Sequence, residues 1–131
     1  MHVISDALYF PPVNQSSFEG ILAVGGDLSP ERLLLAYKSG IFPWFNPGEP
    51  ILWWAPKSRM VLYFEDLTIS KSMRNVLNRN TFKVTFNQDF RAVISNCSTI
   101  KREGQRGTWI SQEMIEAYCK LNEMGIAKSV E

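Results

Sequence analysis

Cysteine and histidine are scarce in this chain of 131 residues, which contains two cysteines and one histidine. Cys97 and Cys119 do not have the spacing of a metal knuckle or of a redox pair, and His2 is the only imidazole that could join them. Because a zinc site needs several such ligands at suitable spacing, the sequence predicts no metal site. We interpret both cysteines as buried thiols rather than as ligands or nucleophiles.

Long apolar runs are also missing, and no stretch of the sequence is long enough to span a bilayer. The first ten residues include Asp6 and no lysine or arginine, so they lack the basic start of a secretory signal. We therefore expect a cytoplasmic protein with no membrane partner. The 45% hydrophobic content is sufficient for the core of one ordinary domain.

The net charge is only +1, but the charges are unevenly distributed. Residues 1–70 include four basic and seven acidic side chains, whereas residues 71–106 include eight basic and two acidic ones. A basic middle between acidic ends is typical of a surface that binds nucleic acid phosphates. A solvated helical face is the alternative, and the charge pattern alone favours neither interpretation.

Aromatic residues and prolines are concentrated in residues 40–54, GIFPWFNPGEPILWW, which contain five aromatic residues and three prolines. Proline fixes φ and donates no hydrogen bond, so this segment is expected to form stiff loops rather than a long helix or a central strand. Trp53 and Trp54 end a short apolar run, which predicts a buried strand. Trp44 lies between Pro43 and Phe45 just after a helix stop, and we interpret it as an exposed functional side chain.

Helix caps and apolar spacing predict the secondary structure. Helices are expected after the N-cap residues Ser29, Ser70 and Ser111, with Gly40 and Gly125 ending the first and last of them. A short helix is expected over residues 89–95. Strands are expected over residues 51–54, 60–64 and 81–86, with a further strand beginning at residue 127.

The helix after Ser70 is expected to be amphipathic. Its apolar residues Met73, Val76 and Leu77 are predicted to face inward, which leaves Lys71 and Arg74 on the outer face. The loop of residues 99–107 contains three basic residues and two glycines, and we expect it to be mobile.

Several motifs together resemble the leucyl/phenylalanyl-tRNA–protein transferase family, and the resemblance covers nearly the whole chain. They are GILAVGGDLSPERLLLAYKSGIFPWF (residues 20–45), PILWWAPKSRMVL (50–62), ISKSMRN (69–75), TWIS (108–111) and EAY (116–118). The combination of GGDLSPERLL and GIFPWF at this separation is highly specific.

The resemblance implies an α+β fold in two parts. Residues 1–58 would form a small N-terminal α/β domain, and residues 59–131 the first part of an incomplete acetyltransferase-like (GNAT-type) αβ domain. Family members continue beyond the position of Glu131 with a glycine-rich strand pair, a GESMFS-type segment and a DxQ-type segment. These are absent here, so we expect a truncated chain that is inactive by itself and contains no catalytic residue.

The implied activity is that of an aminoacyltransferase in the bacterial N-degron pathway. Such an enzyme moves leucine or phenylalanine, and less readily methionine, from aminoacyl-tRNA to proteins that begin with lysine or arginine. An aminoacyl ester is already activated, so the reaction needs neither ATP, a metal nor another cofactor. What the protein must supply is positioning and stabilisation of the oxyanion. No DNA partner is implied.

The resemblance assigns Trp44, Trp109 and Tyr118 to binding of the aminoacyl-tRNA 3′ end. Core packing is the alternative for these aromatic residues, and it is strongest for Tyr118, which also falls on the apolar stripe of its helix.

The resemblance assigns Lys71, Arg74 and Arg79 to the tRNA phosphates. This sequence departs from the family pattern at Asn75 and Asn78, which stand where basic residues are common. We therefore expect either weaker tRNA binding or a larger contribution from the loop of residues 101–106. Lys128 replaces a common histidine, and we assign it no role.

Two other functions fit the same features. A non-enzymatic tRNA- or RNA-binding module would use the basic middle and stack Trp44 and Trp109 on unpaired bases. An interaction domain that binds peptides would use the aromatic cluster instead. Sensitivity of binding to salt and to RNA distinguishes these alternatives.

Overall fold

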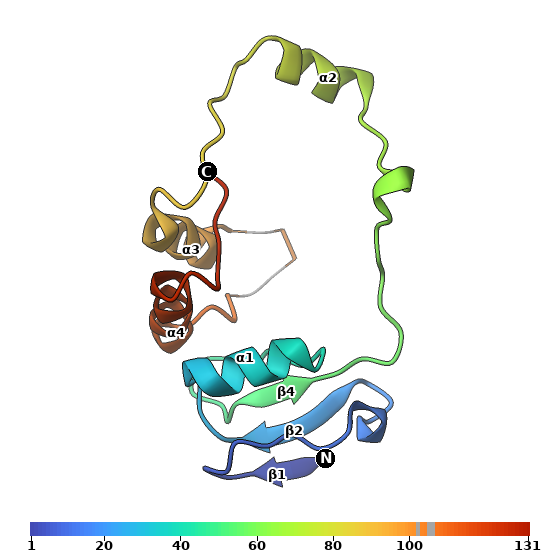
Figure 1. The fold of residues 1–131 in the computed structure, drawn as a ribbon, viewed down its shortest axis with the longest axis vertical. Helices are drawn as coiled ribbons and strands as arrows, with labels where there is room; N and C mark the ends of the chain where they lie inside the picture. Colours follow the sequence, from blue (N-terminus) through green and yellow to red (C-terminus); the bar gives the residue numbers. More distant parts are fainter. Residues whose placement is uncertain (102, 105–106) are drawn as a thin grey trace.

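The computed structural model describes residues 1–101, 103–104 and 107–131. A four-stranded sheet lies near the N-terminus, in the order β1 (His2–Ile4), β2 (Ile21–Gly25), β4 (Leu52–Trp54) and β3 (Phe42–Pro43). β1 pairs with β2 in parallel, and the other two pairings are antiparallel. The described helices are α1 (Pro30–Lys38), α2 (Lys71–Asn78), α3 (Phe90–Thr99) and α4 (Gln112–Glu123), with 3₁₀ turns η1 (Val13–Gln15) and η2 (Phe64–Asp66). This architecture confirms the predicted α+β class (Figure 1).

Local sequence signals explain where α1 begins and ends. The Ser29 hydroxyl accepts a hydrogen bond from the Arg32 N–H at 3.4 Å, and Pro30 occupies the first helical position. Gly40 has a φ of +71°, a conformation that side chains disfavour, and it ends the helix as predicted. The helix therefore begins and ends where the sequence predicts.

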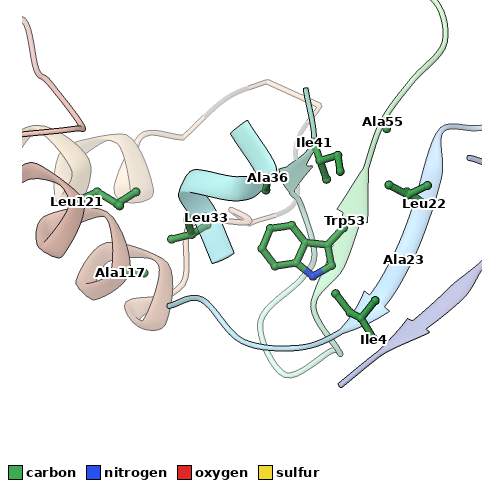
Figure 2. Close-up of a cluster of buried hydrophobic side chains, with 10 residues drawn as sticks. All are labelled: Ile4, Leu22, Ala23, Leu33, Ala36, Ile41, Trp53, Ala55, Ala117 and Leu121. Carbon is green, nitrogen blue, oxygen red and sulfur yellow. The ribbon is translucent and has the colours of Figure 1, made fainter. Parts of the chain in front are cut away.

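Trp53 occupies the centre of the hydrophobic core and is completely buried. Its indole extends from β4 toward Leu33 and Ala36 of α1, with Ala117 and Leu121 of α4 on the far side of α1 (Figure 2). The indole N–H donates to the Gly25 carbonyl at 2.9 Å, so its polar atom is satisfied. The prediction of a buried strand is thus confirmed for Trp53, whereas the neighbouring Trp54 is half-buried.

Arg32 is buried, with 1% of its surface exposed, which the sequence analysis did not predict. Its guanidinium donates to the carbonyl oxygens of Ser5 and Ala7 at 2.9 and 3.1 Å and forms an ion pair with Asp27 at 3.4 Å. The pKa of Asp27 lies below its usual value, mainly because the carboxylate accepts a hydrogen bond from Ser29, with Arg32 adding to the effect. Arg32 therefore fixes the chain after β1 to α1.

α3 and α4 pack together beside α1 (Figure 1). Asp89 caps α3 through the Ala92 N–H at 3.1 Å, and Ser111 caps α4 through the Met114 N–H at 3.2 Å. A two-pronged ion pair joins Arg91 to Glu116, with both N–O distances at 2.9 Å. α4 agrees closely with the prediction, while α3 is longer than the expected residues 89–95.

The segment between β4 and α3 differs from the prediction. α2 forms after the predicted cap, with the Ser70 hydroxyl accepting from the Met73 N–H at 3.2 Å, but Met73, Val76 and Leu77 are all exposed. The expected inward orientation is wrong because none of the described residues covers this face of α2. Figure 1 shows the segment leaving β4 as a wide excursion with α2 at its far end.

The expected strands over residues 60–64 and 81–86 do not form in the described part of the chain, apart from one bridge between Phe86 and Val130. The strand expected from residue 127 is reduced to the same bridge. A strand needs hydrogen bonds from a neighbouring strand, and apolar alternation alone does not supply that neighbour.

We expect Trp53→Ala to lower the free energy of unfolding by about 3–5 kcal/mol, because it empties the centre of the core and leaves the Gly25 carbonyl without its donor. Urea denaturation followed by circular dichroism measures this loss. The control is Phe18→Ala, since Phe18 is fully exposed and its replacement should change stability by no more than about 0.5 kcal/mol. Equal effects of the two substitutions would contradict the assignment of Trp53 to the core.

Candidate functional site

Trp44 stands at the surface on a well-supported backbone. Its N–H donates to the Leu52 carbonyl at 2.9 Å, while the buried side chains of Pro43 and Phe45 flank it. The Trp44 ring is 49% exposed and tilts against the Trp54 ring, with the centroids 5.3 Å apart. The Trp54 indole N–H donates to the Trp44 carbonyl at 2.6 Å. The predicted exposure of Trp44 is confirmed, and an exposed indole is suited to stacking on a planar group.

Trp109 lies in the turn before α4 and is half-buried. Its carbonyl accepts from the Ser111 N–H at 3.1 Å, next to the α4 cap. A hollow of about 440 Å³ lies between the segment after Trp44 and the start of α4. It is lined by Phe45, Pro47, Gly48, Glu49, Ser111, Gln112 and Glu113. The structure therefore brings together the segments that carry the two tryptophans, although Trp109 takes part in none of the ring pairs found among the described residues.

Tyr118 lines a second, more apolar pocket of about 440 Å³ between α1, the start of α3 and α4. Its hydroxyl forms a short hydrogen bond with the Tyr37 hydroxyl, and the two rings meet edge to face with centroids 6.4 Å apart. Burial, and then the hydrogen bond to Tyr37, raises the pKa of Tyr118 well above its ordinary value. Tyr118 therefore keeps its phenolic proton at neutral pH.

The lining of this pocket suits an apolar ligand with a polar end. Besides the two tyrosines it includes the side chains of Leu34, Phe90, Leu121, Ile126, Ala127 and Lys128. The aliphatic and aromatic groups favour an apolar side chain, and the hydroxyl pair offers hydrogen bonds at one edge. Lys128, which had no predicted role, adds a positive charge at the rim.

Tyr37 is the residue that the sequence analysis missed. It lies on α1, where it fits the apolar stripe that begins with Leu33 and Leu34, and nothing in the sequence indicates that its hydroxyl reaches Tyr118, 81 positions away. Because Tyr37 is 48% exposed and its hydroxyl can also bond to water, no sequence signal points to this pairing.

The predicted basic residues lie apart from the aromatic ones. Lys71 and Arg74 lie one turn apart on α2, and Arg79 caps its C-terminal end. All three are exposed. Figure 1 shows α2 far from α1 and α4, so the structure does not bring this basic group to the Tyr118 pocket. In the 101–106 loop, Lys101 is exposed, whereas Arg102 and Arg106 lie outside the described residues.

Among the described residues, no group of three histidine, cysteine, aspartate or glutamate side chains lies close enough together to hold a metal ion. Cys119 is buried in α4 as predicted, and Cys97 is half-buried. A search of the described helices for one able to cross a bilayer finds none.

Raising the pH above about 10 should destabilise the protein through Tyr118. The unfolded chain loses this phenolic proton near pH 10, whereas the folded chain keeps it to higher pH, so stability falls as the pH rises past the unfolded pKa. We expect Tyr118→Phe to reduce this loss between about pH 9 and pH 11, measured as the urea midpoint.

The matched control is Tyr63→Phe, which removes an exposed phenol outside the pocket and should keep the unmodified pH dependence. An unchanged pH dependence in Tyr118→Phe would contradict the raised pKa of Tyr118.

Comparison with known proteins identifies the family. Residues 61–131 match the family model described as leucyl/phenylalanyl-tRNA protein transferase, and residues 26–57 match the model of its N-terminal domain. Proteins named leucyl/phenylalanyl-tRNA–protein transferase from Flavobacterium johnsoniae and Flavobacterium psychrophilum are 69% and 63% identical over the whole chain. One from Syntrophus aciditrophicus is 55% identical over 98% of it.

The chain spans 62% of the length of the two Flavobacterium proteins and 54% of the Syntrophus protein. Within that span the match is continuous and includes the segments that carry Trp44, Trp109 and Tyr118. The chain therefore belongs to the leucyl/phenylalanyl-tRNA protein transferase family.

Proposed function

We propose that this chain carries the aminoacyl-tRNA binding part of a transferase that moves leucine or phenylalanine, and less readily methionine, to proteins beginning with lysine or arginine. The observation that carries the proposal is the apolar pocket closed by Tyr37 and Tyr118. Its size and lining suit the side chain of leucine or phenylalanine better than a polar one. The product would enter a bacterial N-degron pathway, and the reaction would take place in the cytoplasm, where aminoacyl-tRNAs are present.

The proposed roles are those that the family resemblance assigns, and the exposure of the side chains supports them. The exposed face of Trp44 is suited to stacking on the terminal adenosine, with Trp109 on the adjoining segment. Tyr118 holds the aminoacyl group near the hydroxyl pair. Lys71, Arg74 and Arg79 contact phosphates of the acceptor helix, as exposed cations on α2 can do.

The chemistry asks little of the protein beyond positioning. An uncharged α-amine attacks the ester carbonyl carbon, which forms the peptide bond and breaks the bond between that carbon and the ribose oxygen. The amine gives up one proton, and the released ribose oxygen takes up a proton to become the tRNA hydroxyl. We assign no general base within this chain and propose that the chain by itself does not catalyse transfer. We also propose a domain boundary at residues 58 and 59, between the two segments that match the family models.

Family membership does not favour the alternatives of a non-enzymatic RNA-binding module or a peptide-binding domain. The tRNA-binding element of the first alternative is retained as one part of the transferase.

We expect Trp44→Ala to weaken binding of Phe-tRNA to this chain by about tenfold, since stacking on a base contributes about 1–3 kcal/mol.

Replacing both Lys71 and Arg74 by alanine should weaken the binding of Phe-tRNA and of uncharged tRNA alike. The slope of the logarithm of affinity against the logarithm of salt concentration should fall by the amount that about two phosphate contacts contribute. Filter binding at several salt concentrations measures both effects.

Phe18→Ala is the control for Trp44, and Lys57→Ala, an exposed lysine outside α2, is the control for the basic pair. If the site variants bind tRNA as their controls do, the site assignments are wrong even though the family is right.

Transfer of labelled phenylalanine from Phe-tRNA to a protein that begins with arginine tests the activity. We expect transfer by the Flavobacterium johnsoniae relative and none by this chain alone. Transfer by this chain would refute its proposed inactivity, and transfer by neither protein would refute the proposed reaction and favour a tRNA-binding role.

A further inference from the structure

The pocket closed by Tyr37 and Tyr118 has a single charged side chain among the described residues that line it. This residue is Lys128, which has no part in the roles proposed for the other site residues. The rest of the lining is apolar or carries a hydroxyl, and it includes no carboxylate. A cation beside an apolar pocket, with no acid in the lining to neutralise it, favours a ligand that has an apolar body and an anionic group.

The backbone on both sides of Lys128 is held at the rim of this pocket. Before it, the Ala127 carbonyl accepts a hydrogen bond from the Asn122 side chain at 2.9 Å. After it, the Ser129 N–H donates to the side-chain oxygen of Asn87 at 2.9 Å, and Ser129 is buried. Because both neighbours are held, the Lys128 side chain extends from a defined point at the pocket mouth.

The Lys128 ammonium group is accessible to a ligand. The residue is exposed, and its Nζ atom lies beside the turn after α4, 3.8 Å from the position that a Cβ would take on Gly125. Within the described part of the chain, the ammonium belongs to neither of the two ion pairs. The alternative role for this cation is a favourable interaction with the C-terminal end of α4.

An aminoacyl-tRNA bound in this pocket would bring an anion to the same place. A tRNA is far larger than a pocket of about 440 Å³, so only the aminoacyl group can enter, and the terminal ribose must lie at the mouth. The ester oxygen and the 5′-phosphate are attached to the same ribose, so this phosphate is the nearest tRNA anion to the aminoacyl group. Lysine binds phosphate as a compact charge on a flexible stem, which suits a residue at the rim.

We propose that Lys128 binds the 5′-phosphate of the 3′-terminal nucleotide of aminoacyl-tRNA. This contact holds the terminal ribose at the mouth of the pocket while the aminoacyl side chain lies against Tyr118. It is separate from the contacts proposed for Lys71, Arg74 and Arg79, which lie on α2 or at its C-terminal end. The assignment rests on the aminoacyl pocket that is part of the proposed function.

Two small ligands isolate this contact. Both carry phenylalanine in amide linkage at the 3′ position of adenosine, because the amide resists hydrolysis, and one of them also carries a 5′-methylphosphate. The methylphosphate has a single negative charge, as a phosphodiester of tRNA does. Isothermal titration calorimetry at low salt measures the affinity of this chain for each ligand. We expect the phosphate to raise the affinity by at least about fivefold.

Variants of two lysines locate the contact. Lys128→Ala should remove the gain in affinity and change the affinity for the ligand without phosphate by no more than about twofold, which also shows that the pocket keeps its fold. Lys128→Arg should retain the gain, because arginine keeps the charge. The matched control is Lys120→Ala, since Lys120 lies on α4 but lines a different hollow. It should bind both ligands as the unmodified chain does.

The assignment of Lys128 is overturned if Lys128→Ala retains the gain in affinity, if it weakens both ligands equally, or if Lys120→Ala loses the gain as well. A role only at the end of α4 would lower the stability of Lys128→Ala without changing the ratio of the two affinities.

Failure of this assignment is distinguishable from failure of the proposed function. If the unmodified chain binds both ligands with equal affinity, the role of Lys128 is refuted and the aminoacyl pocket is not. If the unmodified chain binds neither ligand, the proposed aminoacyl pocket is refuted, and the role of Lys128 is refuted with it.

Discussion

Burial of the Trp53 side chain is the interaction on which the ordered part of this molecule depends. The indole fills the space between the sheet and α1, and its single polar atom is bonded to the Gly25 carbonyl of β2. One side chain therefore joins β4, β2 and α1 and leaves no unsatisfied donor. Figure 2 shows the other core side chains arranged around this ring or behind α1.

The candidate site residues lie on elements that pack around Trp53. Trp44 comes directly after β3, which pairs with β4, so its backbone position follows from the same sheet. Tyr37 belongs to α1, whose buried face packs near Trp53, and it meets Tyr118 of α4. The tyrosine pocket thus depends on how α1 and α4 pack, and this packing in turn depends on Leu33, Ala117 and Leu121.

Residues 60–86, which include α2, illustrate the opposite situation because many of their apolar side chains are exposed. α2 forms because Ser70 caps it and because a helix satisfies its hydrogen bonds internally, but helix formation alone does not cover its apolar face. Residues 81–86 have the alternation of a strand and yet pair only at one end. In this segment the helix forms from local interactions, but its apolar side chains are exposed and do not form a second core.

The sequence by itself determined the family, the caps and ends of α1 and α4, the burial of Trp53 and the exposure of Trp44, because each of these depends on residues close together in the chain. Only the tertiary structure decided that Tyr37 joins Tyr118 and that Arg32 is buried and bonded to the Ser5 and Ala7 carbonyls. It also decided that residues 60–64 pair with no strand among the described residues. These outcomes depend on contacts between distant segments, and a side chain's own chemistry does not specify which distant partner it meets. Helices close their hydrogen bonds within a few residues, whereas strands and pockets require a neighbour that the local sequence does not contain.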